Sequence, residues 1–306
     1  PAPQFSAPET GDIAPSGRIY WTIKLRLTDP GESVDAPHIA FIGAGNMAGS
    51  IIGGLLESGH PAERISAADP FPESLARLEA LGPLQTCADN AESAAGADVV
   101  ILAVKPQVMA EATESISAAV AENGSLVISI AAGVTMESMA ARLGESAAIV
   151  RCMPNTPALL GCGASGLFGN SNVSPDQRSL AQSIMGAVGV TRWVDSEQAL
   201  DAITALSGSG PAYFFLFTEA MIDAGCALGL DRETAATLAT QTALGAARMA
   251  VENDVDLVEL RRRVTSPGGT TERAIQQFEN DGLRGLVGSA MEAAAERAAE
   301  MAREMG

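Results

Sequence analysis

The sequence has few side chains that can exchange a proton near neutral pH. Its 306 residues include two histidines, His38 and His60, and two lysines, Lys24 and Lys105. Histidine is the most frequent general acid or base, because its ordinary pKa lies nearest to neutral pH. A mechanism that needs a histidine therefore has few candidates, and Lys105 is the single lysine after residue 36.

Positive charge and long apolar runs are also scarce. The formal net charge is −18 at pH 7, which argues against nucleic acid or an anionic membrane surface as a partner. No apolar run reaches the length needed to cross a membrane. We therefore expect a soluble chain whose acidic surface serves solubility or adaptation to salt.

Cysteine is sparse and scattered. The four cysteines form no Cys-x-x-Cys pair and have no histidine at metal-ligand spacing, so no metal site is predicted. The N-terminal stretch also lacks the charged-then-apolar layout of a secretory signal. Scattered cysteines without such a signal favour a reducing, cytoplasmic location.

One stretch, residues 38–49, organises the rest of the chain. Four apolar residues lead into a Gly-x-Gly-x-x-Ala turn, and apolar residues at helical spacing follow at once. In a dinucleotide fingerprint the first glycine makes a tight turn, and the second lets the backbone approach the pyrophosphate at a helix N-terminus. An ordinary glycine-rich turn is the alternative, but the following strands favour a dinucleotide. The expected contacts are Gly43, Gly45, Asn46, Met47 and Ala48.

The chain divides into three parts. Residues 1–36 show no helical period and read as an extension outside the fold, with an added edge strand as the alternative. Residues 37–195 alternate between strands and helices, which predicts a Rossmann-like, doubly wound parallel sheet. Residues 196–306 predict helices only, so the fold class is α/β followed by an all-helical domain. The expected strands after the first are Ile65–Asp69, Ala97–Val104, Ser125–Ile130, Ala147–Cys152, Ala164–Phe168 and Thr191–Val194.

The expected helices differ in character between the two domains. In the first domain they are Glu73–Leu81, Pro106–Val120 and Met136–Leu143. In the second they are Ser196–Leu206, Ala212–Leu228, Arg232–Asn253, Leu257–Arg263, Glu272–Asn280 and Leu283–Glu304. Capping-box spacing at Asp195 with Gln198, and at Asp256 with Glu259, marks two helix starts. The helix Ala212–Leu228 is apolar on most sides and must be buried, which favours a subunit interface.

Polar or small residues follow several strands, at the edge where doubly wound sheets bind ligands. The lone lysine of Val104-Lys105-Pro106 favours a ligand contact over a plain turn. Ala131 lies in a loop of small residues (129–135) that could pass close to a cofactor, although a simple tight turn is the alternative. The loop 151–157, with Met153, Pro154 and Asn155, is stiff because two prolines bracket Asn-Thr, and it presents polar groups. Asp69 ends the second strand, where an acidic side chain can hold a ribose 2′-hydroxyl and favour NAD. It can equally be a turn residue before Pro70, so the choice between NADH and NADPH stays open.

The helical domain contains a second candidate site. Val264-Thr265-Ser266-Pro267-Gly268-Gly269-Thr270-Thr271 precedes a helix, which makes it a candidate anion cradle with outward-pointing N–H groups. A well-capped turn between helices is the alternative. Residues 207–211 (Ser-Gly-Ser-Gly-Pro) predict a second break between helices.

Taken together, these segments resemble the pyrroline-5-carboxylate reductase family, from about His38 to the C-terminus. The resemblance rests on Phe-Ile-Gly-Ala-Gly-Asn-Met-Ala (41–48), Val-Lys-Pro-Gln (104–107), Met-Pro-Asn-Thr-Pro (153–157), Ser-Gly-Ser-Gly-Pro-Ala-Tyr (207–213) and Val-Thr-Ser-Pro-Gly-Gly-Thr-Thr (264–271). It implies a reductase that passes hydride from NADPH or NADH to C5 of pyrroline-5-carboxylate, giving L-proline. It also implies interlocked dimers, often in a ring of five, in which one chain's nucleotide domain faces its partner's Ser-Pro-Gly-Gly loop.

The same resemblance assigns the second site to the substrate. It implies binding by Ser266, Gly268, Gly269, Thr270 and Thr271, with backbone N–H groups from residues 269–271 on the carboxylate. The Thr271 hydroxyl is the implied catalytic group, hydrogen-bonded to the ring nitrogen, and the loop at 153–157 with Asn155 is expected beside the nicotinamide. Asp69-Pro70 departs from many relatives, which carry an arginine for the 2′-phosphate.

Two other functions remain as alternatives. A related imine or β-hydroxyacid reductase would share the nucleotide half, but a β-hydroxyacid dehydrogenase would be expected to place a catalytic lysine in the helical domain, where this chain has none. A non-catalytic dinucleotide-binding protein would have no need of the Ser266–Thr271 segment.

Overall fold

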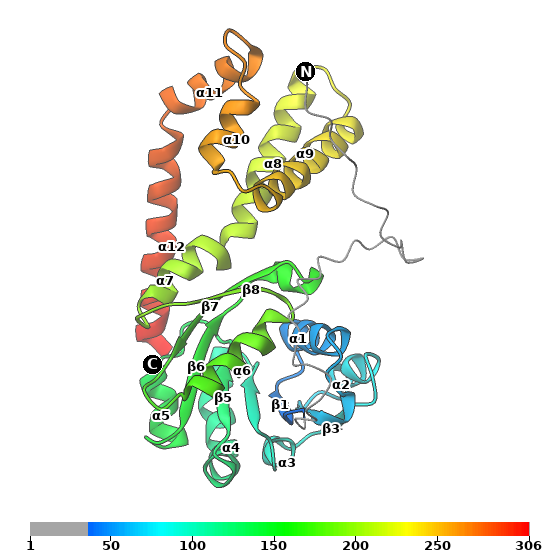
Figure 1. Ribbon diagram of the computed structural model, residues 1–306, viewed down its shortest axis with the longest axis vertical. Coiled ribbons are helices and arrows are strands. Elements are labelled where there is room, and N and C mark those ends of the chain that lie inside the picture. The colour runs from blue at the N-terminus through cyan, green and yellow to red at the C-terminus, as the bar shows by residue number, and fades with distance from the viewer. Residues whose placement is uncertain (1–35, 306) are drawn as a thin grey trace. The chain divides into compact units, whose positions relative to one another are not determined.

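The computed structural model of the chain describes residues 36–305, so the extension predicted at the N-terminus lies almost wholly outside the described residues. One eight-stranded sheet forms the first part of this region (Figure 1), with strand order β3-β2-β1-β4-β5-β6-β7-β8. Its strands are β1 (Ile39–Ile42), β2 (Ile65–Ala68), β3 (Gln85–Cys87), β4 (Val99–Leu102), β5 (Leu126–Ser129), β6 (Ala148–Met153), β7 (Gly163–Gly169) and β8 (Gly189–Trp193).

The sheet is parallel from β1 to β6 only. Strand β7 runs antiparallel to β6, and β8 is parallel to β7, so the prediction of a wholly parallel sheet is wrong for the last two strands. The reason is the connection between β6 and β7, which contains only the short 3₁₀ helix η3 (Thr156–Leu160). A parallel return needs a longer crossover, usually a helix, whereas an antiparallel return does not.

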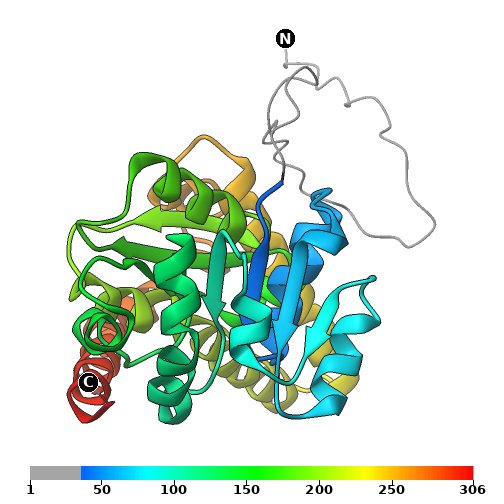
Figure 2. The same ribbon diagram turned by 90° about the horizontal axis from the view of Figure 1, so that it is seen from below.

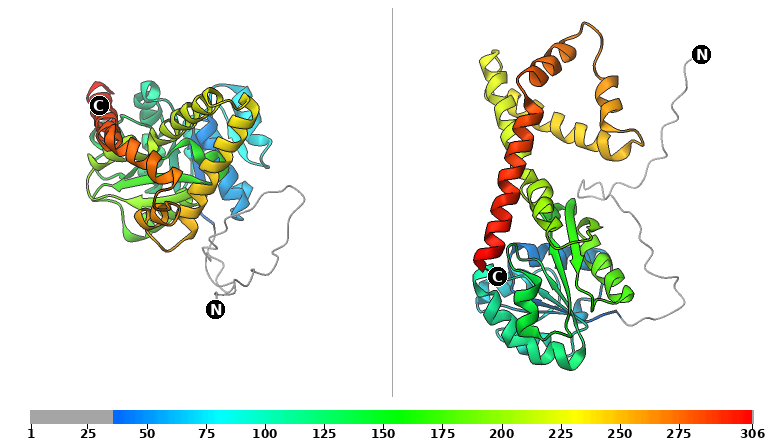
Figure 3. Two further views of the ribbon diagram at one scale, coloured as in Figure 1. Left: turned by 90° about the horizontal axis from the view of Figure 1, so that it is seen from above. Right: turned by 90° about the vertical axis from the view of Figure 1, so that its left-hand side faces the viewer.

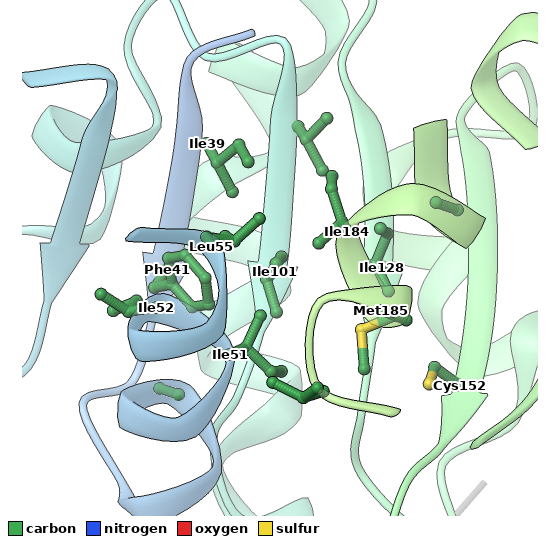
Figure 4. Packing of buried hydrophobic residues seen from close by; sticks show 14 of the residues in the cluster. Ile39, Phe41, Ile51, Ile52, Leu55, Ile101, Ile128, Cys152, Ile184 and Met185 are labelled. Carbon is green, nitrogen blue, oxygen red and sulfur yellow. The ribbon is translucent and has the colours of Figure 1, made fainter. Parts of the chain in front are cut away.

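Helices cover both faces of the sheet (Figure 2). Helices α1 (Asn46–Glu57), α2 (Pro72–Glu79) and α6 (Pro175–Gly186) pack on one face, and α3 (Asn90–Ala94), α4 (Met109–Asn123) and α5 (Met136–Leu143) pack on the other. On the first face, Ile51 and Leu55 of α1 and Ile184 of α6 lie over Phe41 and Ile101 (Figure 4). Burial on both faces explains why β1, β4 and β5 are almost uninterrupted apolar runs.

One strand and two α-helices of this domain were not predicted: β3, α3 and α6. The first two are short and mostly polar, so no hydrophobic period marks them. Helix α6 does have a sequence signal. Ser174 and Gln177 form a complete capping box, with Pro175 at the first helical position.

The second part of the chain is helical, as predicted, with its elements shown in Figure 3. Asp256 caps its helix as expected, because its carboxylate accepts from the Glu259 N–H at 2.8 Å. The cap predicted at Asp195 is wrong: Ser196 Oγ instead accepts from the N–H of Ala199. The helices are α7 (Ala199–Ile203), the π-helix η4 (Thr204–Gly208), α8 (Gly210–Ala227), α9 (Arg232–Glu252), α10 (Leu257–Arg263), α11 (Thr270–Asn280) and α12 (Leu283–Met305).

The break predicted at residues 207–211 does separate two α-helices, but it starts earlier, at residue 204, and is largely π-helical. The chain passes from α7 to α8 through the π-helix η4, in which the Ser209 N–H donates to the Thr204 carbonyl at 2.8 Å. Pro211 occupies the first turn of α8, where a backbone N–H would have no acceptor within the helix, so the N–H that proline lacks is not needed. π-helical turns are rare and are found frequently at functional sites.

Helix α8 carries a large exposed apolar face. Phe214, Phe215 and Leu216 are 73%, 72% and 68% exposed, so its predicted burial is not met within one chain. Apolar surface of this extent marks an interaction site, which is consistent with the expected subunit interface. Over residues 36–305, no helix combines the length and the hydropathy needed to span a membrane.

Candidate active site

The glycine turn lies at the carboxyl edge of β1, where the strand order reverses between β1 and β4 and where doubly wound sheets bind ligands. Gly43 has φ of +99°, and a Cβ there would lie 2.7 Å from the Ala103 carbonyl oxygen and 3.0 Å from Val104. Only glycine fits this turn. The contact with Val104 also shows that the loops after β1 and β4, which hold two sets of predicted cofactor contacts, meet.

Gly45 is different, because apart from its own chain neighbours and helix backbone no atom of residues 36–305 lies within 4 Å of a Cβ built on it. It is the N-cap of α1 and supplies no side chain to cap the first N–H groups of that helix. Open space in front of uncapped N–H groups is what a pyrophosphate needs. This turn and helix start therefore fit a dinucleotide.

These two glycines give a matched pair of variants. Gly43→Ala is expected to lower the Tm and abolish cofactor binding, because the new methyl group meets backbone at a positive φ. Gly45→Ala should leave the Tm unchanged and weaken NADPH binding, since its methyl group enters only the open space. Differential scanning calorimetry and titration of NADPH fluorescence measure the two effects. Equal loss of Tm in both variants would contradict this distinction.

Asp69 braces the glycine turn from the end of β2. Its Oδ2 accepts from the Ala44 N–H at 2.8 Å, and its Oδ1 accepts from the Phe71 N–H at 2.9 Å. Asp69 is thus the turn residue that one of the two interpretations predicted. A carboxylate can accept further hydrogen bonds, so a ribose contact stays a prediction. Lys105 is exposed directly before Pro106, which starts the short 3₁₀ helix η2 (Pro106–Val108).

A second group of predicted residues meets further along the same edge. Ala131, after β5, and Met153, at the end of β6, line one small cavity together. The cavity is also lined by residues that were not predicted as cofactor contacts: Arg151 on β6, Asp201 on α7, Thr204 on η4 and Met301 on α12. Arg151 had a visible signal, because it is a charged residue inside an apolar strand.

Two ionisable groups of this region have shifted pKa values. Burial raises the pKa of the Asp201 carboxyl, and nearby Glu197 adds to the shift while Arg151 opposes it. Burial also raises the pKa of the Cys152 thiol to about 12, against an opposing hydrogen bond with Ser165.

The buried thiol leads to a labelling prediction. Because the thiolate is the nucleophile, Cys152 should stay unmodified when the native protein is treated with iodoacetamide at pH 8. Exposed Cys162 should react first, and Cys152 should react only after unfolding. Peptide mass spectrometry measures both sites. Rapid labelling of native Cys152 would contradict this account.

Asn155 is buried and both ends of its amide are engaged. Its Nδ2 donates to the Ser207 carbonyl of η4 at 2.9 Å, and its Oδ1 accepts from the Ala164 N–H of β7 at 2.9 Å. The side chain therefore fixes the loop after β6 against η4 and β7. Its predicted contact with the nicotinamide stays a prediction, and Pro154 is likewise buried beside it.

The Ser266–Thr271 segment forms an exposed turn at the start of α11. Gly268, at φ of +71°, donates its N–H to Glu272 Oε2 at 2.8 Å, and the Gly269 N–H donates to the Ser266 carbonyl at 3.0 Å. The N–H groups of Thr270 and Thr271 have no acceptor among residues 36–305, and α11 has no side-chain cap. Of the three N–H groups predicted for the carboxylate, the Gly269 one is thus already engaged.

Comparisons with known proteins agree on one family. A protein-family model described as pyrroline-5-carboxylate reductase dimerisation matches residues 197–301. A second family model, described as NADP oxidoreductase, coenzyme F420-dependent, matches residues 38–133. The pyrroline-5-carboxylate reductase of Pseudomonas aeruginosa is 52% identical over 273 residues, covering 89% of this chain and 100% of that protein. The chain belongs to the pyrroline-5-carboxylate reductase family.

Other pyrroline-5-carboxylate reductases extend this result. The one from Haemophilus influenzae is 48% identical, covering 86% of this chain and 97% of that protein. The solved structure from Coxiella burnetii has a TM-score of 0.85 at 47% identity, covering 87% of this chain and 99% of that chain. The Plasmodium falciparum structure, which has NADP bound, has a TM-score of 0.75 at 30% identity, and the match covers 87% of this chain and 98% of that chain. The fold is therefore a Rossmann-like domain followed by a helical dimerisation domain.

Proposed function

We propose that the chain reduces L-1-pyrroline-5-carboxylate to L-proline with NADPH or NADH. The observation that carries the proposal is the presence in one chain of two uncapped helix starts. One follows the glycine turn and fits a pyrophosphate, and the other follows Ser266–Gly269 and fits a carboxylate. The relatives named above are reductases of this substrate.

The reaction needs one hydride and one proton. The hydride moves from C4 of the reduced nicotinamide to C5 of the ring, and the imine nitrogen carries the proton, so the products are the secondary amine and the oxidised cofactor. Because a protonated cyclic imine is already electrophilic, catalysis depends more on positioning than on a strong acid. The scarcity of histidine is consistent with this chemistry.

We propose the following contacts with the cofactor and the substrate. Gly45, Asn46 and Met47 would receive the pyrophosphate at the start of α1, with Lys105 and Pro106 beside the adenosine half. Ala131, Met153 and Pro154 would form the wall beside the nicotinamide. At the other site, the N–H groups of Thr270 and Thr271 would hold the substrate carboxylate, and the Thr271 hydroxyl would hydrogen-bond the ring nitrogen.

The exposed apolar face of α8 supports a proposal for the assembly. We propose a homodimer joined through the helical domain (residues 196–306), with each active site formed by the nucleotide domain (37–195) of one chain and the Ser266–Thr271 loop of its partner. Five such dimers would form a ring, and the protein would act in the cytoplasm. Family membership and the dimerisation match support the dimer.

The direct test is oxidation of NADH and of NADPH with pyrroline-5-carboxylate, followed by absorbance at 340 nm, with L-proline measured as the product. We expect turnover, and the ratio of kcat/KM for the two cofactors measures whether Asp69 favours NADH. A β-hydroxyacid with the oxidised cofactor serves as the control substrate. Cofactor binding without reduction of the imine would overturn the proposal.

A further inference from the structure

Arg151 is a buried cation near the carboxyl end of β6, where it pairs with Ser129, the last residue of β5. It is 8% exposed, although it lies on β6 between apolar Val150 and Cys152. Its Nη1 donates to Glu197 Oε1 at 2.6 Å, and the two side chains are 10% and 24% exposed. A buried charge is strongly destabilising when its partner is removed. Arg151 therefore favours the conformation in which the Glu197 carboxylate stays paired with it.

Glu197 makes a second hydrogen bond with the same oxygen. Its Oε1 also accepts from the backbone N–H of Met136 at 2.7 Å. Met136 is the first residue of α5, directly after its N-cap Thr135, so this hydrogen bond fixes the end of the loop that connects β5 to α5. One carboxylate oxygen therefore joins that loop, strand β6 and the segment that leads into α7.

The two elements joined by Glu197 both line one cavity. Ala131 and Gly133 come from the β5–α5 loop, and Met153 comes from the end of β6. The loop is also closely packed against α12, because a Cβ on Gly133 would lie 3.3 Å from the Cβ of Met301. Any movement of the loop relative to β6 would change the distance between Ala131 and Met153.

We propose that Glu197 is a positioning residue for hydride transfer. Its carboxylate sets the spacing between the β5–α5 loop and the end of β6, and thereby the wall that orients the nicotinamide ring. Glu197 acts through Arg151 and the Met136 N–H rather than through contact with the reacting atoms. This inference rests on the proposed function, because Ala131 and Met153 are proposed to line the nicotinamide.

The chain offers a matched control for Glu197 at the opposite edge of the same sheet. Asp98 Oδ2 accepts from the His38 N–H at 2.7 Å and lies 3.8 Å from Arg64 Nη2. It is thus a carboxylate oxygen shared between a backbone N–H and an arginine, as in Glu197. Because it lies before β1 and β4, it is remote from the cofactor edge.

The experiment compares Glu197→Gln with Asp98→Asn. A misplaced ring slows hydride transfer steeply with distance, so Glu197→Gln should lower kcat by about 10- to 100-fold. Its KM for pyrroline-5-carboxylate and its Kd for NADPH should stay within about twofold of wild type, since neither ligand's binding groups are touched. With NADPH deuterated at C4, the isotope effect on kcat should rise, because hydride transfer becomes more rate-limiting. Asp98→Asn should change none of these values.

A second pair of variants isolates the hydrogen bond from Met136. Met136→Pro removes the N–H at the first helical position, where proline is well tolerated, and displaces the carboxylate. Met136→Ala loses the same side chain but keeps the N–H. We expect lower kcat and a larger isotope effect in Met136→Pro than in Met136→Ala. This comparison tests the positioning role of Glu197 even if Glu197→Gln fails to fold.

The possible outcomes are distinct. An unchanged isotope effect in both Glu197→Gln and Met136→Pro, or a loss of NADPH affinity that accounts for all of the lost rate, would overturn the positioning role. Absence of turnover in the wild-type protein would instead overturn the proposed function. In that case the Kd for NADPH, measured by fluorescence, would still show whether the cofactor site is intact.

Discussion

Thr271→Ala is expected to lower kcat/KM for pyrroline-5-carboxylate by about 10- to 100-fold. The estimate follows because a hydrogen bond to a charged group contributes about 1.5–3 kcal/mol, and each 1.4 kcal/mol is about tenfold in rate. Thr271 lies in the first turn of α11, and its hydroxyl makes no hydrogen bond to another residue in the 36–305 region. Loss of this hydroxyl should therefore lower the rate of substrate turnover and leave the stability of the fold unchanged.

Two further variants distinguish the effect of the Thr271 hydroxyl from that of the backbone N–H groups. Thr271→Ser keeps a hydroxyl and should restore most of the rate, while Thr270→Ala changes the adjacent exposed threonine and should have a smaller effect. All three keep the N–H groups proposed for the carboxylate, so KM should change less than kcat. The Tm serves as the control for folding. Full activity in Thr271→Ala would remove this residue from the proposed mechanism while leaving the reaction in place.

Phe215→Glu is expected to abolish both dimer formation and activity. Phe215 is exposed in the isolated chain on the apolar face of α8, and a two-fold dimer places every interface substitution at two positions. A carboxylate buried there without a partner costs several kcal/mol, so the dissociation constant should rise by about 1,000-fold or more. Sedimentation velocity measures the assembly, and cofactor oxidation measures the activity.

The matched control for this substitution is Val190→Glu. Val190 is an exposed apolar residue on β8, the last strand of the sheet and outside the helical domain. It should leave both the dimer and the activity unchanged. A fully active Phe215→Glu monomer would show that each site is complete within one chain.

Mixed dimers test the shared site directly. Gly45→Asp should fold, because a side chain there enters open space, yet its charge should repel the pyrophosphate. A Gly45→Asp chain paired with a Thr271→Ala chain would have one site with both intact halves if sites are shared between chains. Activity should then reappear on mixing two impaired proteins. If each site belonged to one chain, no activity would be recovered.

Local patterns in the sequence predicted much of the architecture. Helix α5 was predicted with its bounds, because helical apolar spacing is a local pattern that acts over a few residues, and in the structure Thr135 caps its start. Strands β1, β4 and β5 were also found, since burial on both faces leaves an apolar run. The reversed direction of β7 was missed because strand direction depends on how the chain returns, which side-chain periodicity does not record.

The candidate site was predicted less completely than the fold. The glycine turn and the loop before α11 have characteristic sequences, whereas the Arg151–Glu197 pair joins residues 46 positions apart. No local pattern links two such positions. Asn155 illustrates the same limit, because no local pattern shows that its amide hydrogen-bonds to the Ser207 carbonyl and to the Ala164 N–H.

The π-helix between α7 and α8 also sets the direction in which the side chains of α8 point relative to α7. An α-helix advances by 3.6 residues per turn, so each residue corresponds to a rotation of about 100°. Deleting one residue from Thr204–Gly208 would restore regular α-helical pitch and turn α8 by about that angle relative to α7. The apolar face with Phe214 and Phe215 would then point away from its present direction. In this family member, the geometry of assembly thus depends on one additional residue in a helix.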